Sequence, residues 1–181
     1  GQLRVAMEDR MAEAAERGMR TVIVRAGDFF GGGHGAWLDL VLAKEIGRAR
    51  LTYPGPLDLT HEWAYLPDLA SVLVRLAEIR ETLPPFATFG FPGHADTGRE
   101  FTTAIARAAR SKLQIKRMSW WLIHALRPFV PLCRELSEIA YLWHEPHRID
   151  GSKLAALIGD VPHTPLDVAV ARALQDLGAT A

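Results

Sequence analysis

The chain has 181 residues, of which 49% are hydrophobic and 23% are charged, a composition that fits a soluble globular domain with a real core. Its 21 Lys and Arg residues balance 21 Asp and Glu residues, so the zero formal charge gives no support for nucleic-acid binding. The single cysteine excludes an internal disulfide, and no apolar run reaches the ~20 residues of a membrane-spanning helix, so we expect a cytoplasmic protein without nucleic-acid or membrane partners.

The first part of the chain predicts a helix that leads directly into a strand. Leu3, Met7 and Met11 recur at helical spacing, and Gly18 is a typical helix terminator. Residues 21–26 are β-branched and almost continuously apolar, as in a parallel strand that is buried on both faces. Helix and strand together make an α/β unit. Because this unit starts at the first residues, we expect the chain to belong to a longer protein whose preceding segment carries most of the chemistry.

Strand and helix patterns alternate after a glycine-dense loop at residues 27–35. Strands are expected at residues 51–53, 59–66, 86–91 and 113–116, and helices at 36–46, 68–79, 97–109, 120–126, 132–143, 152–157 and from 164 onward. Asp68 is expected to cap its helix, and Thr97 is expected to form a capping box with Glu100. Thr164 and Pro165 give a strong start to the last helix. Trp120 and its neighbouring tryptophan are expected in the core, although a lid or partner surface stays open.

Several short motifs occur in an order that is informative as a set. Glu8 is followed after 25 − 8 = 17 residues by Arg25, and the segment Asp28-Phe29-Phe30-Gly31 comes next. Further on, residues 65–70 read Tyr-Leu-Pro-Asp-Leu-Ala, and Thr97 and Glu100 open a helix. In this order the motifs resemble the C-terminal portion of the extended short-chain dehydrogenase/reductases, the NAD-dependent epimerase/dehydratase family.

The resemblance implies an α/β fold, with a partial Rossmann-like parallel sheet followed by a mostly helical C-terminal substrate subdomain. It implies one incomplete domain, in which residues 1–50 end the Rossmann-like core and residues 51–181 form the substrate-binding subdomain. It also implies an NAD or NADP cofactor and a small polar substrate that is reduced, epimerised or dehydrated by hydride transfer. The residues expected to border the cofactor are Arg25, Asp28, Phe30 and Gly31, and those expected to reach the substrate are His61 and Tyr65.

The chain also departs from the family pattern. Arg4 stands where the family motif has its Lys, the motif's Tyr would precede residue 1, and the cofactor's Gly-rich loop is absent. We therefore expect no catalytic residue in this chain, and no activity from the chain alone. His61 stands where nucleotide-sugar members often have an Arg, which weakens the case for a sugar-nucleotide substrate. A non-catalytic ligand-binding or interaction module derived from the family is the alternative.

Other patterns have competing interpretations. Residues 31–36 satisfy the dinucleotide pattern G-x-G-x-x-A, but the expected strand ends four residues earlier, so we favour a flexible loop on the substrate side. Arg25 and Asp28 either line a pocket or form an ion pair that shapes the loop. His144 and His147 are three residues apart with a proline between them, so no metal site is expected. If the preceding segment is missing, the strand at residues 21–26 has an unpaired edge, and a homo-oligomer is possible.

Overall fold

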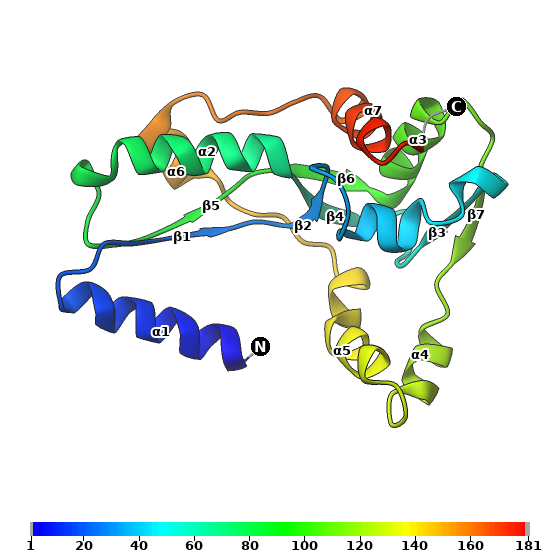
Figure 1. Cartoon of the computed structure of the whole chain (residues 1–181), viewed down its shortest axis with the longest axis horizontal. Helices are drawn as coiled ribbons and strands as arrows, with labels where there is room; N and C mark the ends of the chain where they lie inside the picture. The colour runs from blue at the N-terminus through cyan, green and yellow to red at the C-terminus, as the bar shows by residue number, and fades with distance from the viewer. Residues whose placement is uncertain (1, 180–181) are drawn as a thin grey trace.

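The computed structural model describes residues 2–179 and has the α/β architecture that the sequence predicts (Figure 1). The helices are α1 (Gln2–Glu16), α2 (Leu66–Glu78), α3 (Gly98–Ala108), α4 (Trp120–Leu126), α5 (Pro131–Ile139), α6 (Ser152–Ile158) and α7 (Leu166–Asp176). The strands are β1 (Thr21–Arg25), β2 (Asp28–Phe30), β3 (Arg50–Tyr53), β4 (Thr60–Tyr65), β5 (Phe86–Gly90), β6 (His94–Thr97) and β7 (Gln114–Arg117). Short helical turns of other types cover Leu38–Leu42, Ile46–Arg48, Arg80–Thr82 and Ala140–Trp143.

The first layer of strands is a parallel pair, β1 and β5, in which Val22 lies opposite Ala87. Helix α1 packs against this pair from one side, and α2 lies on the other side (Figure 1). Val22 and Val24 share a hydrophobic core with α2 and with Leu154 of α6. The parallel pairing confirms the α/β unit that was predicted for the start of the chain. Because β5 pairs with β1, residues on both sides of position 50 build this layer, and the division near that position stays a prediction.

The burial of β1 differs from the expectation. Ile23 and its two neighbours are only half-buried, whereas the sequence predicted a strand covered on both faces. Among residues 2–179, β5 is the single strand paired with β1, so one edge of β1 lacks a strand partner. Large apolar side chains near the start of α1 are exposed as well: Leu3 is 85% exposed and Met7 is 53% exposed. Apolar surface therefore remains uncovered on this side of the molecule.

A second group of strands carries the main core. β2, β4 and β6 form one mixed sheet in that order, and β3 pairs with β7 in parallel. Helices α3 and α7 pack on each other and cover one face of the mixed sheet. Within this core the rings of Trp63 and Phe101 stack at 4.2 Å, and Phe30 meets Phe101 edge-on. Strands β2 and β6 were not predicted, because each is short and lies in a segment with little β-branched character.

The structure corrects four local predictions. Residues 36–46 hold only a widened helical turn at Leu38–Leu42 in place of a regular helix. Helix α5 begins at Pro131 and tightens into a different helical turn after Ile139. Asp68 does not cap α2, which begins at Leu66; its carboxylate accepts hydrogen bonds from the backbone and side chain of Thr164. These hydrogen bonds fix the segment that leads into α7, and the side chain of Thr164 does not cap that helix.

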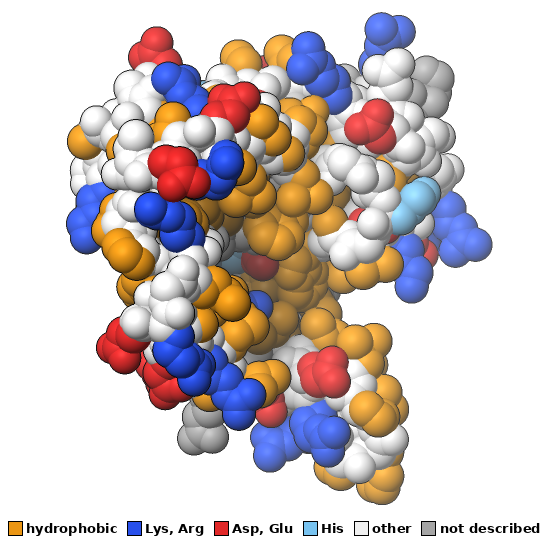
Figure 2. Space-filling model, turned by 60° about the vertical axis from the view of Figure 1, so that its left-hand side comes forward, with side chains coloured by type: hydrophobic (Ala, Val, Ile, Leu, Met, Phe, Trp, Pro, Cys, Tyr) orange, Lys and Arg blue, Asp and Glu red, His pale blue; other side chains and the backbone are white. Residues whose placement is uncertain are grey.

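Helices α4 and α5 form a hairpin that projects away from the sheets (Figure 1). Trp120 is half-buried and donates from Nε1 to the carbonyl of Pro54 at 2.6 Å, whereas Trp121 is 73% exposed, so the core prediction is wrong for the second tryptophan. Phe129, at the tip of the hairpin, is 82% exposed. Figure 2 shows a deep hollow with hydrophobic walls above this projecting lobe. In the described part of the chain, every helix is too short or too polar to cross a bilayer.

Candidate functional site

The site begins at the carboxyl end of β1, where the chain turns sharply into β2. Gly27 makes this turn possible, because a Cβ at this position would overlap with the backbone carbonyl of Glu62 in β4. The turn therefore presses directly on β4. As a result, Asp28 is held beside His61, 33 residues later in the chain.

Asp28 and His61 form the polar centre of the site. The Oδ2 atom of Asp28 lies 2.8 Å from Nε2 of His61, whose side chain is only 4% exposed. The ring of Trp143 stacks on the imidazole at 4.1 Å with an interplanar angle of 9°, and the ring of His147 meets it edge-on at 4.5 Å. Because Asp28 is the acceptor of this hydrogen bond, the neutral imidazole carries its proton on Nε2.

Burial decides the charge state of this centre. Burial lowers the pKa of His61, and the hydrogen bond and charge of Asp28 offset this effect only in part, so the pKa stays below its usual value. Burial and the charge of Asp28 both raise the pKa of the nearby Tyr53. At neutral pH the centre therefore consists of a carboxylate, a neutral imidazole and a neutral phenol, with no cation among them.

Arg25 has a different partner from the one considered in the sequence. Its guanidinium lies 2.6 Å from the carboxylate of Glu8 in α1, and Asp28 pairs with His61 instead. The ion pair ties α1 to the end of β1. Because the Arg25 side chain is 61% exposed, it also faces solvent at the end of the strand. Its predicted contact with a cofactor stays a prediction.

The remaining predicted residues, Phe30, Gly31 and Tyr65, are buried in the core. Phe30 is completely buried, and its ring centroid is 5.2 Å from that of Tyr65, which is 3% exposed. Burial raises the pKa of Tyr65. Gly31 has a φ of +78°, which favours glycine, and it presses its backbone against the ring of Tyr65. Neither ring reaches the surface, so the predicted contacts of these residues with cofactor and substrate stay predictions.

The glycine-rich segment after β2 is not arranged to bind a dinucleotide. β2 ends directly before Gly31, so the spacing between the strand and the first glycine is closer to that of the dinucleotide-binding pattern than the sequence indicated. However, the carboxylate of Asp39 accepts hydrogen bonds from the backbone N–H groups of Gly35 at 2.9 Å and Ala36 at 2.7 Å. Burial alone would raise the pKa of Asp39, but these hydrogen bonds outweigh it and lower the pKa. The N–H groups that a pyrophosphate would need are thus taken by a negative charge.

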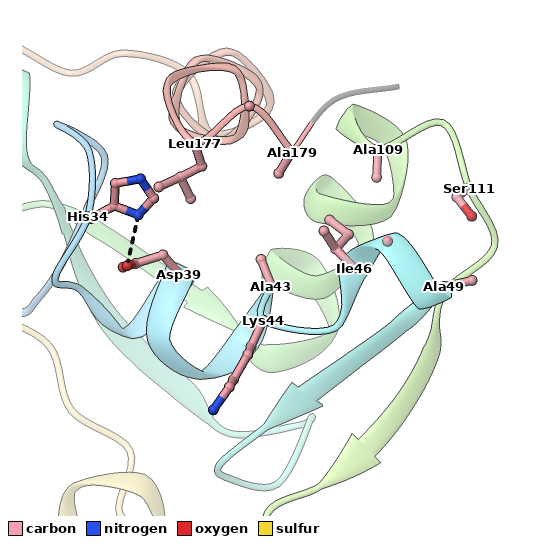
Figure 3. A pocket seen from close by; sticks show the side chains of 12 residues that line it. His34, Asp39, Ala43, Lys44, Ile46, Ala49, Ala109, Ser111, Leu177 and Ala179 are labelled. Carbon is pink, nitrogen blue, oxygen red and sulfur yellow. Dashed lines mark ion pairs between the residues drawn. The ribbon is translucent and has the colours of Figure 1, made fainter.

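A cavity of about 660 Å³ lies beside this loop (Figure 3). His34 and Asp39 face each other on its wall, with 3.5 Å between Nδ1 and Oδ2, and Leu177 lies close to them. Figure 3 shows Lys44 extending away from this pair. The carboxylate of Asp39 already accepts hydrogen bonds from the loop, and the side chain of His34 is 79% exposed, so the cavity offers few fixed polar groups.

Two members of the site could not be recognised from the sequence. Trp143 and His147 reach His61 across 82 (143 − 61) and 86 (147 − 61) residues of chain. His144 turns elsewhere, with Nδ1 at 2.9 Å from the carbonyl of Ala140. Within residues 2–179, no three His, Cys, Asp or Glu side chains are placed to share a metal ion.

Comparison with known proteins identifies the fold. No protein-family model and no curated protein matches the sequence. Among solved structures, RMD from Pseudomonas aeruginosa complexed with NADPH matches with a TM-score of 0.66 and 17% identity, over 95% of this chain and 53% of that chain. The human epimerase family protein SDR39U1 (isoform 2) with NADPH matches with a TM-score of 0.62 and 20% identity, over 87% of this chain and 49% of that one.

A UDP-galactose 4-epimerase matches with a TM-score of 0.67 and 16% identity, over 96% of this chain and 51% of the epimerase. The chain thus spans about half the length of the solved structures that it matches. These likenesses establish a partial Rossmann-like fold of the kind seen in epimerase-type proteins, and confirm the fold class that the motifs implied.

Proposed function

We propose that the chain is the C-terminal, substrate-side half of an NAD(P)-dependent protein of the epimerase, dehydratase or reductase type. Two structures that share its fold are described with NADPH, and the chain spans about half of each. The observation that carries the proposal is the pairing of Asp28 with His61 just beyond the carboxyl end of β1. Open α/β sheets bind their ligands at this end of the strands.

The charges at the centre support a small polar substrate without a diphosphate. Asp28 is negative, and His61 is neutral at pH 7 because burial lowers its pKa. A diphosphate in contact with Asp28 would face a carboxylate, and the neutral ring of His61 beside it offers no compensating charge, which is unfavourable in a partly buried site. A hydroxyl group, in contrast, can donate a hydrogen bond to the carboxylate of Asp28.

The described residues supply only part of a cofactor site. We propose that Arg25, Asp28, Phe30 and Gly31 border the nicotinamide end of NAD or NADP, and that a segment outside this chain holds the pyrophosphate. The bound cofactor would supply or accept a hydride, and Asp28 and His61 would orient the substrate. The exposed Arg4 occupies the position of the family's Lys, but its guanidinium stays charged and does not tune a neighbouring group in the same way.

Calorimetry and a turnover assay test this proposal. The purified chain, mixed with NADPH and a panel of small carbonyl compounds, is expected to leave the absorbance of the reduced nicotinamide unchanged; turnover would overturn the proposed inactivity. The chain joined to the segment encoded upstream in the same reading frame is expected to bind NADPH. In that longer protein, His61→Asn should raise the KM for a substrate without weakening NADPH binding, whereas His124→Asn, at an exposed position, should change neither.

A second candidate is a non-catalytic ligand-binding or interaction module, which the Arg4 position favours. The same calorimetry separates the two, because NADPH binding without turnover of any substrate supports the module.

The free edge of β1 has a physical consequence for the chain alone. An unpaired parallel edge with half-buried apolar side chains favours self-association. Light scattering that shows a monodisperse monomer would contradict this consequence.

A further inference from the structure

A second polar cavity, of about 360 Å³, lies along the edge strand β6, and neither Asp28 nor His61 lines it. We call it the β6 cavity. Its side chains come from four places in the chain: β4, residues 92–96 around β6, the segment before α6, and the segment that runs into the start of α7. They include Glu62, Pro92, His94, Asp96, Arg148, His163 and Leu166. The volume falls near the lower end of the range for small-molecule sites.

The wall that carries Arg148 is held in place by a buried carboxylate. Glu62 is 1% exposed and accepts hydrogen bonds from the backbone N–H groups of Gly93 at 2.8 Å and Ile149 at 3.3 Å. These bonds join β4 to the two segments on either side of the cavity. Both oxygens of Glu62 are thereby engaged, so the cavity is a fixed feature of the fold and Glu62 is not free to bind a ligand.

The other polar groups of the β6 cavity have unused hydrogen-bonding capacity. Among residues 2–179, the exposed side chains of Arg148 and His163 form no hydrogen bond or ion pair, and Asp96 lies 3.8 Å from Nδ1 of His94, too far for a hydrogen bond. His94 is 4% exposed and its Nε2 lacks a hydrogen-bond partner in the described part of the chain. Buried polar groups usually have partners. The buried imidazole of His94, whose Nε2 is unpartnered at the wall of this cavity, therefore indicates a ligand.

The arrangement of charges narrows the chemistry of that ligand. Arg148 and Asp96 have opposite charges and line the same cavity, yet they do not form an ion pair with each other. A ligand with only a negative charge would be repelled by Asp96, and a ligand with only a positive charge would be repelled by Arg148. Leu166 and Pro92 add an apolar surface between the polar groups.

We propose that the β6 cavity binds a small zwitterion, with its carboxylate on Arg148 and its ammonium group on Asp96. Arg matches a carboxylate with two parallel hydrogen bonds, and a carboxylate accepts the N–H groups of an ammonium ion. The short carbon chain between the two groups lies against Leu166. An amino acid is the simplest molecule with this chemistry. The site is distinct from the Asp28–His61 centre, so it stands or falls independently of the proposed function.

A series of ω-amino acids, in which the distance between the carboxylate and the ammonium group increases, tests the β6 cavity. Glycine, β-alanine, 4-aminobutyrate and 5-aminovalerate are titrated into the whole chain at pH 7.5 by calorimetry, together with butyrate and butylammonium, which carry one charge each. Because the ligand must reach both Arg148 and Asp96, one length is expected to bind best, and the single-charge probes at least about tenfold more weakly. Equal binding across the series, equal binding of a single-charge probe, or no binding up to about 20 mM would overturn the proposal.

Two substitutions test the assigned roles. Arg148→Gln and Asp96→Asn are each expected to weaken the best probe about tenfold or more, because each removes a charge-assisted hydrogen bond. Arg127→Gln, at an exposed position on the α4–α5 hairpin, is the matched control and should leave binding unchanged. Circular dichroism and the unfolding midpoint confirm that each variant is folded. Folded variants that bind the probe as well as the unsubstituted chain would contradict the assignment.

Discussion

Asp28 reaches diagonally across the β2–β4 ladder to His61. In the register of this ladder Asp28 lies opposite Trp63, and its Oδ2 atom is 2.8 Å from Nε2 of the residue two positions earlier. The imidazole is held from its other sides by Trp143 and His147. The carboxylate is thus a charged neighbour in direct contact with a buried ring, which makes the coupling between the two groups measurable.

The first prediction concerns that coupling. In the folded chain, Asp28 raises the pKa of His61 against the lowering effect of burial. Asp28→Asn removes the charge and is therefore expected to lower the pKa of His61 further, as followed by the pH titration of its ring protons in NMR spectra. Asp58→Asn is the control, because Asp58 is exposed and makes no hydrogen bond to His61. An unchanged or higher pKa in Asp28→Asn would contradict the observed pairing.

The second prediction concerns the turn that positions Asp28. Gly27→Ala adds a methyl group against the backbone carbonyl of Glu62, and neither backbone can move without disturbing β4. We expect the free energy of unfolding in urea to fall by about 1–3 kcal/mol. Gly47→Ala is the matched control, because the added methyl group has open space there, and it should change stability by less than about 0.5 kcal/mol. Equal effects at both positions would show that the turn tolerates a side chain.

Local patterns predicted the local structure well. Thr97 and Glu100 form the capping box that their spacing indicates, with the backbone N–H of Thr97 donating to Glu100 at 2.8 Å. The apolar run at residues 21–26 gives β1, whereas its parallel pairing joins it to β5, 65 residues later (86 − 21). The capping box and the apolar run depend on residues within one or two turns of each other. The sequence alone therefore determines them.

The candidate site was predicted only in part, for a physical reason. The motifs named Asp28 and His61 individually, but nothing in the sequence placed their side chains together. The contribution of Trp143 depends on how the segment after α5 folds back over β4, a contact between residues 82 positions apart. Long-range packing also decided the role of Asp68, which its local sequence marks as a helix cap but which binds Thr164. Tertiary contacts, unlike caps, leave no fixed spacing in the sequence.

The third prediction concerns the ion pair between Glu8 and Arg25. Both side chains are partly exposed, at 31% and 61%, so solvent screens the interaction even though its length is 2.6 Å. Glu8→Gln is expected to lower the free energy of unfolding by less than about 1 kcal/mol, and the difference should shrink as salt is added. Glu13→Gln, on the same helix and exposed, is the control. A larger, salt-independent loss would show that Glu8 has a further role at the end of β1.

The last prediction is a pH dependence that originates at His94. Burial, with a smaller contribution from the neighbouring His163, lowers the pKa of His94 from 6.5 to about 4 in the folded chain. Because the folded state resists protonation, the unfolded state binds more protons between these two values. Stability from the neutral ring is therefore complete above pH ~6.5 and is lost as the pH falls towards 4, by at most about 3 kcal/mol.

His94→Leu removes the titrating ring but keeps an apolar side chain in contact with Phe30. Its free energy of unfolding is expected to depend less on pH between 6.5 and 4 than that of the unsubstituted chain, so the stability of the variant relative to the unsubstituted chain should rise as the pH falls. Burial raises the pKa of the neighbouring Asp96, and this group acts in the opposite direction in both proteins. His124→Leu, which removes an exposed histidine, should preserve the original slope. Parallel curves for His94→Leu and the unsubstituted chain would mean that His94 accepts a proton in the folded state as easily as in the unfolded one.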